Sequence, residues 1–310
     1  MIPTQYLPPA LIPFFKESNW TDFLINSTDE FFIDDGSGLK KLSFDHFHWS
    51  ESDLRQWAMC LIHESGKNFD AKRPFVDGTL GSTYRFHILF PPIHSKSVII
   101  SLRKISQKSS KLWEKDPLFH QAISRVKNKK SVLIAGSTSS GKTTLLSELL
   151  NQMDPSERII SLEDTPEINS HHPHHISLVS RQKSADGIGE VQLRDLLKEC
   201  LRMRPNRIIM GECRGSEILD FLITLNTGHQ GALATIHANS AREALKRVEL
   251  LALLSQSHLN SSFIKDLIAL GLQSVIYLES DHSTRKIKEI YDVLGREGDT
   301  LLLRPVLNTQ

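Results

Sequence analysis

A glycine-rich segment followed by a lysine and two threonines is the part of this 310-residue sequence that most directly indicates chemistry. It follows an apolar run at 131–135 and precedes a helical pattern, the context that a phosphate-binding loop requires. Its glycines let the backbone curl so that successive N–H groups point inward, and the dipole of the following helix attracts phosphate. We expect a nucleotide to be bound by Gly136, Ser137, Thr138, Ser139, Ser140, Gly141, Lys142, Thr143 and Thr144.

Two side chains of this segment have specific expected roles. Lys142 would reach the β- and γ-phosphates, and the hydroxyl of Thr143 would bind Mg²⁺. A serine- and glycine-rich turn that happens to contain Lys-Thr is the alternative interpretation, and the strand before it and the helix after it argue against that. The expected ligands are therefore ATP and Mg²⁺.

Carboxylates that follow two later apolar runs could complete a hydrolytic site. Glu212 comes after the run at 207–210, where a parallel sheet would bring it beside the phosphates, so it is the candidate general base. Glu163, with Asp164 beside it, ends the run at 158–162, and we expect it to orient Mg²⁺ and its waters. For an isolated glutamate, a solvated strand end would be the usual interpretation.

Histidines occur in two places that invite a functional interpretation. Within the glycine- and histidine-containing segment 227–239, His237 could donate a hydrogen bond to the γ-phosphate, and His229 is a second candidate nucleotide contact. The cluster at 171–175 suggests a zinc or nickel site. Pro173 makes that stretch extended, so that adjacent side chains point apart, and we do not expect a metal there.

The elements around these motifs indicate two domains. Short strand patterns and one helical pattern predict a small α+β domain, a lysine- and serine-rich stretch follows, and strands then alternate with helices, as in a mostly parallel sheet covered on both faces. A hairpin is expected near the end of that sheet. The expected boundaries are an N-terminal domain at 1–107, a linker at 108–115 and a second domain at 116–310.

Composition limits the cellular setting. No stretch approaches the roughly 20 apolar residues that span a bilayer, and the start lacks the features of a secretory signal, so the cytoplasm is the expected location. The three cysteines are widely spaced and odd in number, which favours reduced thiols. A formal net charge of +1 gives no electrostatic reason to expect a nucleic-acid partner.

The motif set as a whole resembles the secretion ATPase superfamily. The phosphate loop and the segments 159–168, 201–215 and 226–240 are similar, in order, to the superfamily's Walker A, aspartate, Walker B and histidine boxes. The last segment, with 241–249 after it, is most similar to the Tad pilus ATPases, also called CpaF-like. The resemblance implies a PAS-like N-terminal domain followed by a RecA-like P-loop ATPase domain.

The resemblance also implies site residues and partners. Segments 81–92 and 99–104 are similar to the superfamily's N-terminal domain, which assigns contact with the γ-phosphate to Arg85 and Arg103. Ordinary surface arginines on strands are the alternative. Arg204, Arg207 and Arg214 match family positions without an assigned role. The family further implies a homohexamer that works with an inner-membrane platform protein, so that the chain would be cytoplasmic, peripheral at the inner membrane and in contact with the membrane only through its partner.

The expected function is ATP hydrolysis that powers assembly or retraction of a Tad or type IV-like pilus, or secretion of proteins. The catalytic residues would be Lys142, Glu163, Glu212 and His237. A type IV secretion ATPase that moves effectors or DNA is the alternative within the superfamily. A RecA-like DNA translocase and a catalytically inactive assembly scaffold are alternatives from other classes.

Overall fold

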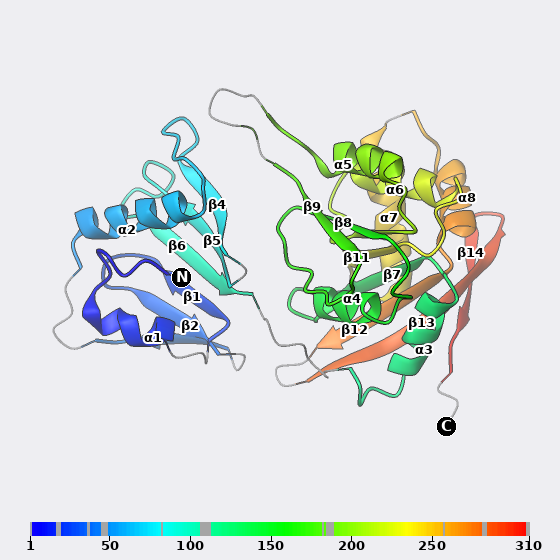
Figure 1. The fold of residues 1–310 in the computed structure, drawn as a ribbon, viewed down its shortest axis with the longest axis horizontal. Helices are drawn as coiled ribbons and strands as arrows, with labels where there is room; N and C mark the ends of the chain where they lie inside the picture. Colours follow the sequence, from blue (N-terminus) through cyan, green and yellow to red (C-terminus); the bar gives the residue numbers. More distant parts are fainter. Residues whose placement is uncertain are drawn as a thin grey trace. The chain divides into compact units, whose positions relative to one another are not determined.

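The structure, a computed structural model, describes residues 2–16, 20–35, 38–44, 49–81, 83–105, 113–181, 183, 189–256, 258–280 and 284–307. The chain divides into two compact units, Met1–Lys108 and Ser109–Gln310, and each is described here by itself (Figure 1). The expected linker at 108–115 lies outside the described residues up to position 112 and is described from Trp113 onward.

The first unit contains a six-stranded antiparallel sheet in the order β3-β2-β1-β6-β5-β4. Its strands are β1 (Asp22–Ile25), β2 (Phe31–Asp34), β3 (Leu39–Leu42), β4 (Phe75–Leu80), β5 (Tyr84–Leu89) and β6 (Ile99–Lys104), and its helices are η1 (Pro9–Leu11), α1 (Ile12–Lys16) and α2 (Glu51–Glu64). Ser50 caps α2 by accepting a hydrogen bond from the backbone N–H of Asp53 at 3.0 Å.

Alternation of buried and less buried residues along the strands builds the core of this unit. In β5, Tyr84, Phe86 and Ile88 are buried, and they pack with Trp57 and other residues of α2 in one cluster. The sequence predicted β1, β2, β5, β6 and α2, and these are confirmed. It missed β4, because Asp-Gly inside a strand is typical of a turn, whereas here Gly78 leaves room for the ring of Phe86.

The second unit contains an eight-stranded sheet in the order β14-β13-β12-β7-β11-β10-β8-β9. The strands from β12 to β9 in that order are parallel, and β13 and β14 continue the sheet antiparallel. They span β7 (Val132–Gly136), β8 (Ile159–Glu163), β9 (His175–Val179), β10 (Arg207–Met210), β11 (Leu233–His237), β12 (Ser274–Ser280), β13 (Arg285–Glu297) and β14 (Thr300–Pro305).

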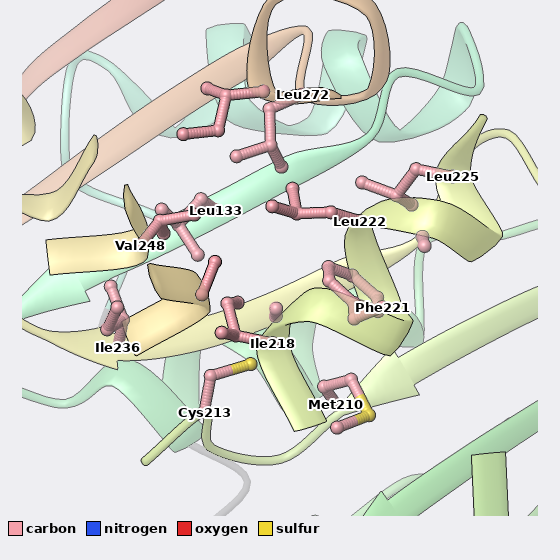
Figure 2. Close-up of a cluster of buried hydrophobic side chains, with 14 of the residues drawn as sticks. Leu133, Met210, Cys213, Ile218, Phe221, Leu222, Leu225, Ile236, Val248 and Leu272 are labelled. Carbon is pink, nitrogen blue, oxygen red and sulfur yellow. The ribbon is translucent and has the colours of Figure 1, made fainter. Parts of the chain in front are cut away.

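Helices cover both faces of this sheet. One buried cluster joins it to α3 (Phe119–Lys127) and α4 (Lys142–Leu150). The other joins it to α5 (Leu193–Cys200), α6 (Glu217–Leu225), α7 (Ala241–Ser255) and α8 (Ser261–Gly271). Figure 2 shows the second cluster, to which Ile218, Phe221 and Leu222 of α6 contribute together with Leu133 and Ile236 of the sheet. The expected parallel sheet with two covered faces is thereby confirmed.

The sequence did not predict every element of this unit. The terminal hairpin is present as β12 and β13, but β14 was not expected. Helix α5 leaves α geometry after Cys200 and ends in a 3₁₀ turn, η2 (Leu201–Met203). Helices α6 and α8 were also not predicted; α6, for example, is apolar around most of its circumference and gives little periodic signal.

Candidate functional site

The phosphate loop lies between β7 and α4 (Figure 1). Every residue of β7 is buried, so the sheet fixes the start of the loop, and the loop ends at Gly141, which precedes the first helical residue. Positive φ angles at Ser139 (61°) and Gly141 (91°) turn the backbone inward. This is the curled conformation in which N–H groups converge to form an anion-binding concavity.

Close packing inside the loop explains both of its glycines. A Cβ atom at Gly136 would collide with the side chain of Ser140. At Gly141 a Cβ would lie 3.0 Å from the indole ring of Trp113, in addition to the cost of its left-handed conformation. The loop is therefore supported from behind by a fully buried tryptophan, which the sequence reasoning did not identify.

Lys142 has its amine inside this curl. Its Nζ donates hydrogen bonds to the carbonyl oxygens of Gly136 at 3.0 Å and Ser137 at 2.8 Å. Burial lowers the pKa of Lys142 to about 8, with the charge of Glu212 opposing the shift and that of Arg214 adding to it. Burial disfavours the protonated amine, and a bound phosphate would stabilise it again through its negative charge. The amine is therefore well suited to bind phosphate.

His237 joins Lys142 to the candidate base. It ends β11 directly opposite Gly136 in the parallel register, so the sheet places it beside the loop. Its Nδ1 lies 3.4 Å from Nζ of Lys142, and its Nε2 lies 2.8 Å from Oε1 of Glu212. Burial, followed by the charge of Lys142, lowers the pKa of His237 and so favours its neutral form. Its Nδ1 accepts a hydrogen bond from Lys142, and its Nε2 lies close to Oε1 of Glu212, an oxygen without a hydrogen-bond partner among the described residues.

Glu212 follows β10 at the same edge of the sheet. Its Oε2 accepts a hydrogen bond from the guanidinium of Arg214, and its Oε1 faces His237. Gly211, just before it, packs against the side chain of Glu163, where a Cβ would lie 3.0 Å from Cγ of Glu163. The structure thus brings Lys142, His237 and Glu212 together, as the sequence predicted for these three residues, and adds Arg214.

Glu163 is placed differently from the other predicted carboxylate. It is 2% exposed, its Oε1 accepts from the backbone N–H groups of Glu167 and Ile168 at 2.8 Å each, and its Oε2 accepts from the hydroxyl of Ser177 at 3.0 Å. Burial raises its pKa even though these hydrogen bonds oppose the shift. Both carboxylate oxygens therefore bind the chain itself, and what the geometry supports is a role in shaping the loop that follows β8.

That loop supplies a carboxylate that the sequence reasoning missed. The negative charge of Glu167 opposes the lowering of the pKa of Lys142 and contributes to the raised pKa of Arg214. Glu167 is therefore near the phosphate loop, although it lies beyond Pro166 and outside any strand. The only sequence signal for it was its position four residues after Glu163.

The residues around the loop fit the requirements of Mg²⁺. Thr143 is the second residue of α4, and its hydroxyl belongs to the loop that would hold the phosphates. Among the described residues there is no group of three or more metal-ligating side chains. Mg²⁺ usually takes one or two protein oxygens together with substrate phosphates rather than a cage of protein ligands, so a sparse oxygen donor set of this kind is suitable.

His229 does not lie beside the phosphate loop of its own chain, contrary to the sequence expectation. It precedes β11 at the edge of the sheet where Gly231 donates to the hydroxyl of Ser131 at 3.2 Å. The loop is at the other end of the parallel strands, separated by the length of β11, roughly 16 Å at about 3.3 Å per residue. Proximity in sequence to His237 was misleading because an extended strand lies between the two histidines.

Arg85 and Arg103 belong to the first unit. They are register partners on the neighbouring strands β5 and β6, and Nε of Arg103 donates to Oδ1 of Asp22 at 2.7 Å. Both therefore stand at the same level of one sheet. Their contact with a γ-phosphate stays a prediction.

The histidine cluster at 171–175 is used for separate local contacts. Nε2 of His172 lies 2.9 Å from the carbonyl oxygen of Asp154, and Nε2 of His175 lies 2.8 Å from the hydroxyl of Ser161. His174 accepts from the guanidinium of Arg158 at 2.9 Å. Each of these three rings thus binds a different part of the chain.

The model of the type II/IV secretion system protein family matches residues 82–289. The chain belongs to this family. The expected membership of the secretion ATPase superfamily is thereby confirmed, and with it the assignment of the chain as an ATPase.

Among curated relatives, a putative conjugal transfer protein of Mycobacterium tuberculosis is 34% identical, over 93% of this chain and 85% of the relative. The type IV secretion system protein VirB11 of Bartonella henselae is 28% identical, over 90% and 89%.

Solved structures of secretion ATPases share the fold. The Legionella pneumophila ATPase DotB matches with a TM-score of 0.67 and 20% identity, over 94% of this chain and 82% of DotB. The pilus retraction motor PilT matches with a TM-score of 0.63 and 20% identity, over 87% and 77%. The predicted fold class, an N-terminal α+β domain followed by a RecA-like ATPase domain, is confirmed. The expected place of the chain in the Tad branch of the superfamily stays a prediction.

Proposed function

We propose that this secretion ATPase hydrolyses ATP with Glu212 as general base, and that the hydrolysis drives transport by a membrane-bound secretion or pilus system. The observation that carries the proposal is the chain of contacts from Lys142 through His237 to Glu212 at the phosphate loop. These contacts support the proposal because a cation suited to the phosphates and a carboxylate suited to activating water lie on either side of one histidine ring.

The chemistry follows from these positions. A water oxygen attacks the γ-phosphorus while Glu212 accepts a proton from that water, the bond between the γ-phosphorus and the β–γ bridging oxygen breaks, and its electron pair leaves with ADP. Lys142 and the N–H groups of the loop stabilise the charge on the phosphates. His237, whose pKa burial lowers, lies with Nε2 2.8 Å from Oε1 of Glu212 and would help to position that carboxylate. Mg²⁺, held by Thr143 and phosphate oxygens, would neutralise further charge.

The first unit would supply Arg85 and Arg103 to the γ-phosphate, so that the site closes when ATP is bound and opens after hydrolysis. The chain would act as a homohexamer, in the cytoplasm and peripheral at the inner membrane, with an inner-membrane platform protein as partner. Among the described residues, none of the helices combines the length and the hydropathy that crossing a bilayer demands.

Two cargoes are compatible with the superfamily. The amino-acid sequence of segment 226–249 supports a Tad or type IV-like pilus, in which the motor moves pilin subunits. The names of the relatives, a putative conjugal transfer protein and VirB11, support type IV secretion of effectors or DNA. Deleting the gene and measuring surface pili and conjugal DNA transfer in the same strain separates the two, because only one of them should disappear.

The catalytic proposal is tested with the purified chain and Mg²⁺-ATP. Glu212→Gln should bind ATP but turn it over about 10²–10⁴-fold more slowly, the usual contribution of a general base. Glu199→Gln is the matched control, because Glu199 is exposed and pairs only with the exposed Arg202 in the described contacts. A Glu212→Gln variant as fast as the wild type would refute the assigned base.

A further inference from the structure

Arg214 occupies one of the two oxygens of the proposed base. Its Nη2 donates to Oε2 of Glu212, while His237 faces Oε1 of the same carboxylate at 2.8 Å. A guanidinium that donates to a carboxylate favours its deprotonated form and so makes it a weaker base. Release of Arg214 from Oε2 would therefore make Glu212 a stronger base for the attacking water.

The main chain at Arg214 is fixed on both sides. The carboxylate of Glu217, in the first turn of α6, accepts hydrogen bonds from the backbone N–H groups of Arg214 and Gly215. On the other side, the N–H of Cys213 donates to the carbonyl oxygen of Thr235 in β11 at 2.8 Å. Glu217 and Cys213 are both buried. Movement at Arg214 is therefore confined to its side chain.

Of the two side chains that face Glu212, Arg214 is the more exposed and the less constrained. Its side chain is 51% exposed, whereas that of His237 is 34% exposed and is also held by Lys142. The guanidinium is near the amine that would meet the γ-phosphate, since its charge acts on Lys142 and lowers the pKa of that amine. Glutamates 167 and 212 in turn raise the pKa of Arg214, which keeps it charged.

We propose that Arg214 is a γ-phosphate-responsive latch on the general base. When ATP binds, the guanidinium exchanges Oε2 of Glu212 for the γ-phosphate, which can accept two parallel N–H bonds from it. Oε2 is then exposed to the attacking water. ADP has no γ-phosphate, so with ADP the latch stays on Glu212, which remains the weaker base. This inference rests on the hydrolytic role proposed above for Glu212.

The latch predicts a change in nucleotide discrimination. In Arg214→Ala, the dissociation constant for ATP should rise about tenfold or more, the scale of a lost charge-assisted hydrogen bond, while that for ADP changes less than about twofold. The turnover number should fall as well, because the γ-phosphate loses a cation. Arg214→Lys keeps the charge but loses the parallel N–H donors of the guanidinium. Its dissociation constant for ATP should lie between those of Arg214→Ala and the wild type.

The experiment measures Mg²⁺-dependent ATP hydrolysis and, by displacement of a fluorescent nucleotide, the affinities for ADP and a non-hydrolysable ATP analogue. Arg202→Ala is the matched control, since Arg202 is 73% exposed and pairs with Glu199. Equal weakening of both nucleotides in Arg214→Ala, or faster turnover, would overturn the latch and leave a purely structural residue or a simple brake. Failure of the wild type to hydrolyse ATP would instead overturn the function on which the latch rests.

Discussion

Titration of Lys142 should make ATP binding take up protons above neutral pH. The amine is 8% exposed and burial lowers its pKa to about 8, so in the nucleotide-free protein it loses its proton between about pH 7 and pH 9. Phosphate oxygens placed against the amine favour the charged form and restore the proton. The sign is therefore fixed: binding takes up protons, and it weakens as the pH rises.

The magnitude follows from the pKa of about 8. The free amine is about half neutral at pH 8 and about nine-tenths neutral at pH 9, so binding should take up about 0.5 and 0.9 protons at these values. If the amine is charged in the complex, the affinity at pH 9 is about tenfold lower than at pH 7, or about 1.4 kcal/mol.

Isothermal titration calorimetry gives the proton uptake directly, from the difference in binding enthalpy between buffers of different ionisation enthalpy at pH 7, 8 and 9. The slowly hydrolysing variant Glu212→Gln is unsuitable for this measurement, because the charge of Glu212 itself affects the pKa of Lys142. A non-hydrolysable ATP analogue is used with the wild type instead. Lys142→Arg is the control, since its guanidinium stays charged throughout this range. Proton uptake below about 0.2 at pH 8 and 9 would refute the reasoning.

Two further predictions concern stability and the support of the loop. Arg207 is 2% exposed and donates to Glu157 at 3.0 Å and to the carbonyl oxygens of Gly231 at 3.0 Å and Val126 at 2.9 Å. Because its removal leaves these buried groups without their donor, Arg207→Ala should lower the free energy of unfolding of the second unit by about 3–5 kcal/mol. Chemical denaturation measures this, with Arg202→Ala as an exposed control, and a loss under 1 kcal/mol would contradict it. Trp113→Ala removes the indole behind Gly141 and should cost about 3–5 kcal/mol and raise the KM for ATP, whereas Trp113→Phe should restore most of both. An unchanged KM in Trp113→Ala would show that the indole does not support the phosphate loop.

The success of the sequence reasoning at the phosphate loop has a local cause. The spacing of glycines, Lys142 and Thr143 specifies a loop whose shape depends on neighbouring residues, and the flanking strand and helix patterns are also local. Glu212 and His237 could be added because each follows a short apolar strand, and parallel strands end at a common edge. Because strand geometry is regular, the place of a residue at the end of a strand in the sequence predicts its place at the edge of the sheet.

Other parts of the site depend on which strands are neighbours. The order of the sheet puts β10 between β8 and β11, so Glu163 packs behind Gly211 and binds the loop that carries Glu167. Nothing in the sequence around Glu163 distinguishes a metal-facing carboxylate from one that accepts two backbone N–H groups. His229 shows the same limit, because the direction of β11 sends it to the edge opposite the loop.

The sequence by itself determined the phosphate loop, the candidate base and the family. Only the tertiary structure decided which polar group each side chain contacts: the pairing of Arg214 with Glu212, the placement of Trp113 behind Gly141, and the burial that lowers the pKa of Lys142. The physical reason is one of range. Loop shape and strand ends are set by residues adjacent in sequence. Burial and side-chain contacts depend on how the elements pack once the sheet has formed, which brings together segments as distant as Lys142 and His237, 95 residues apart.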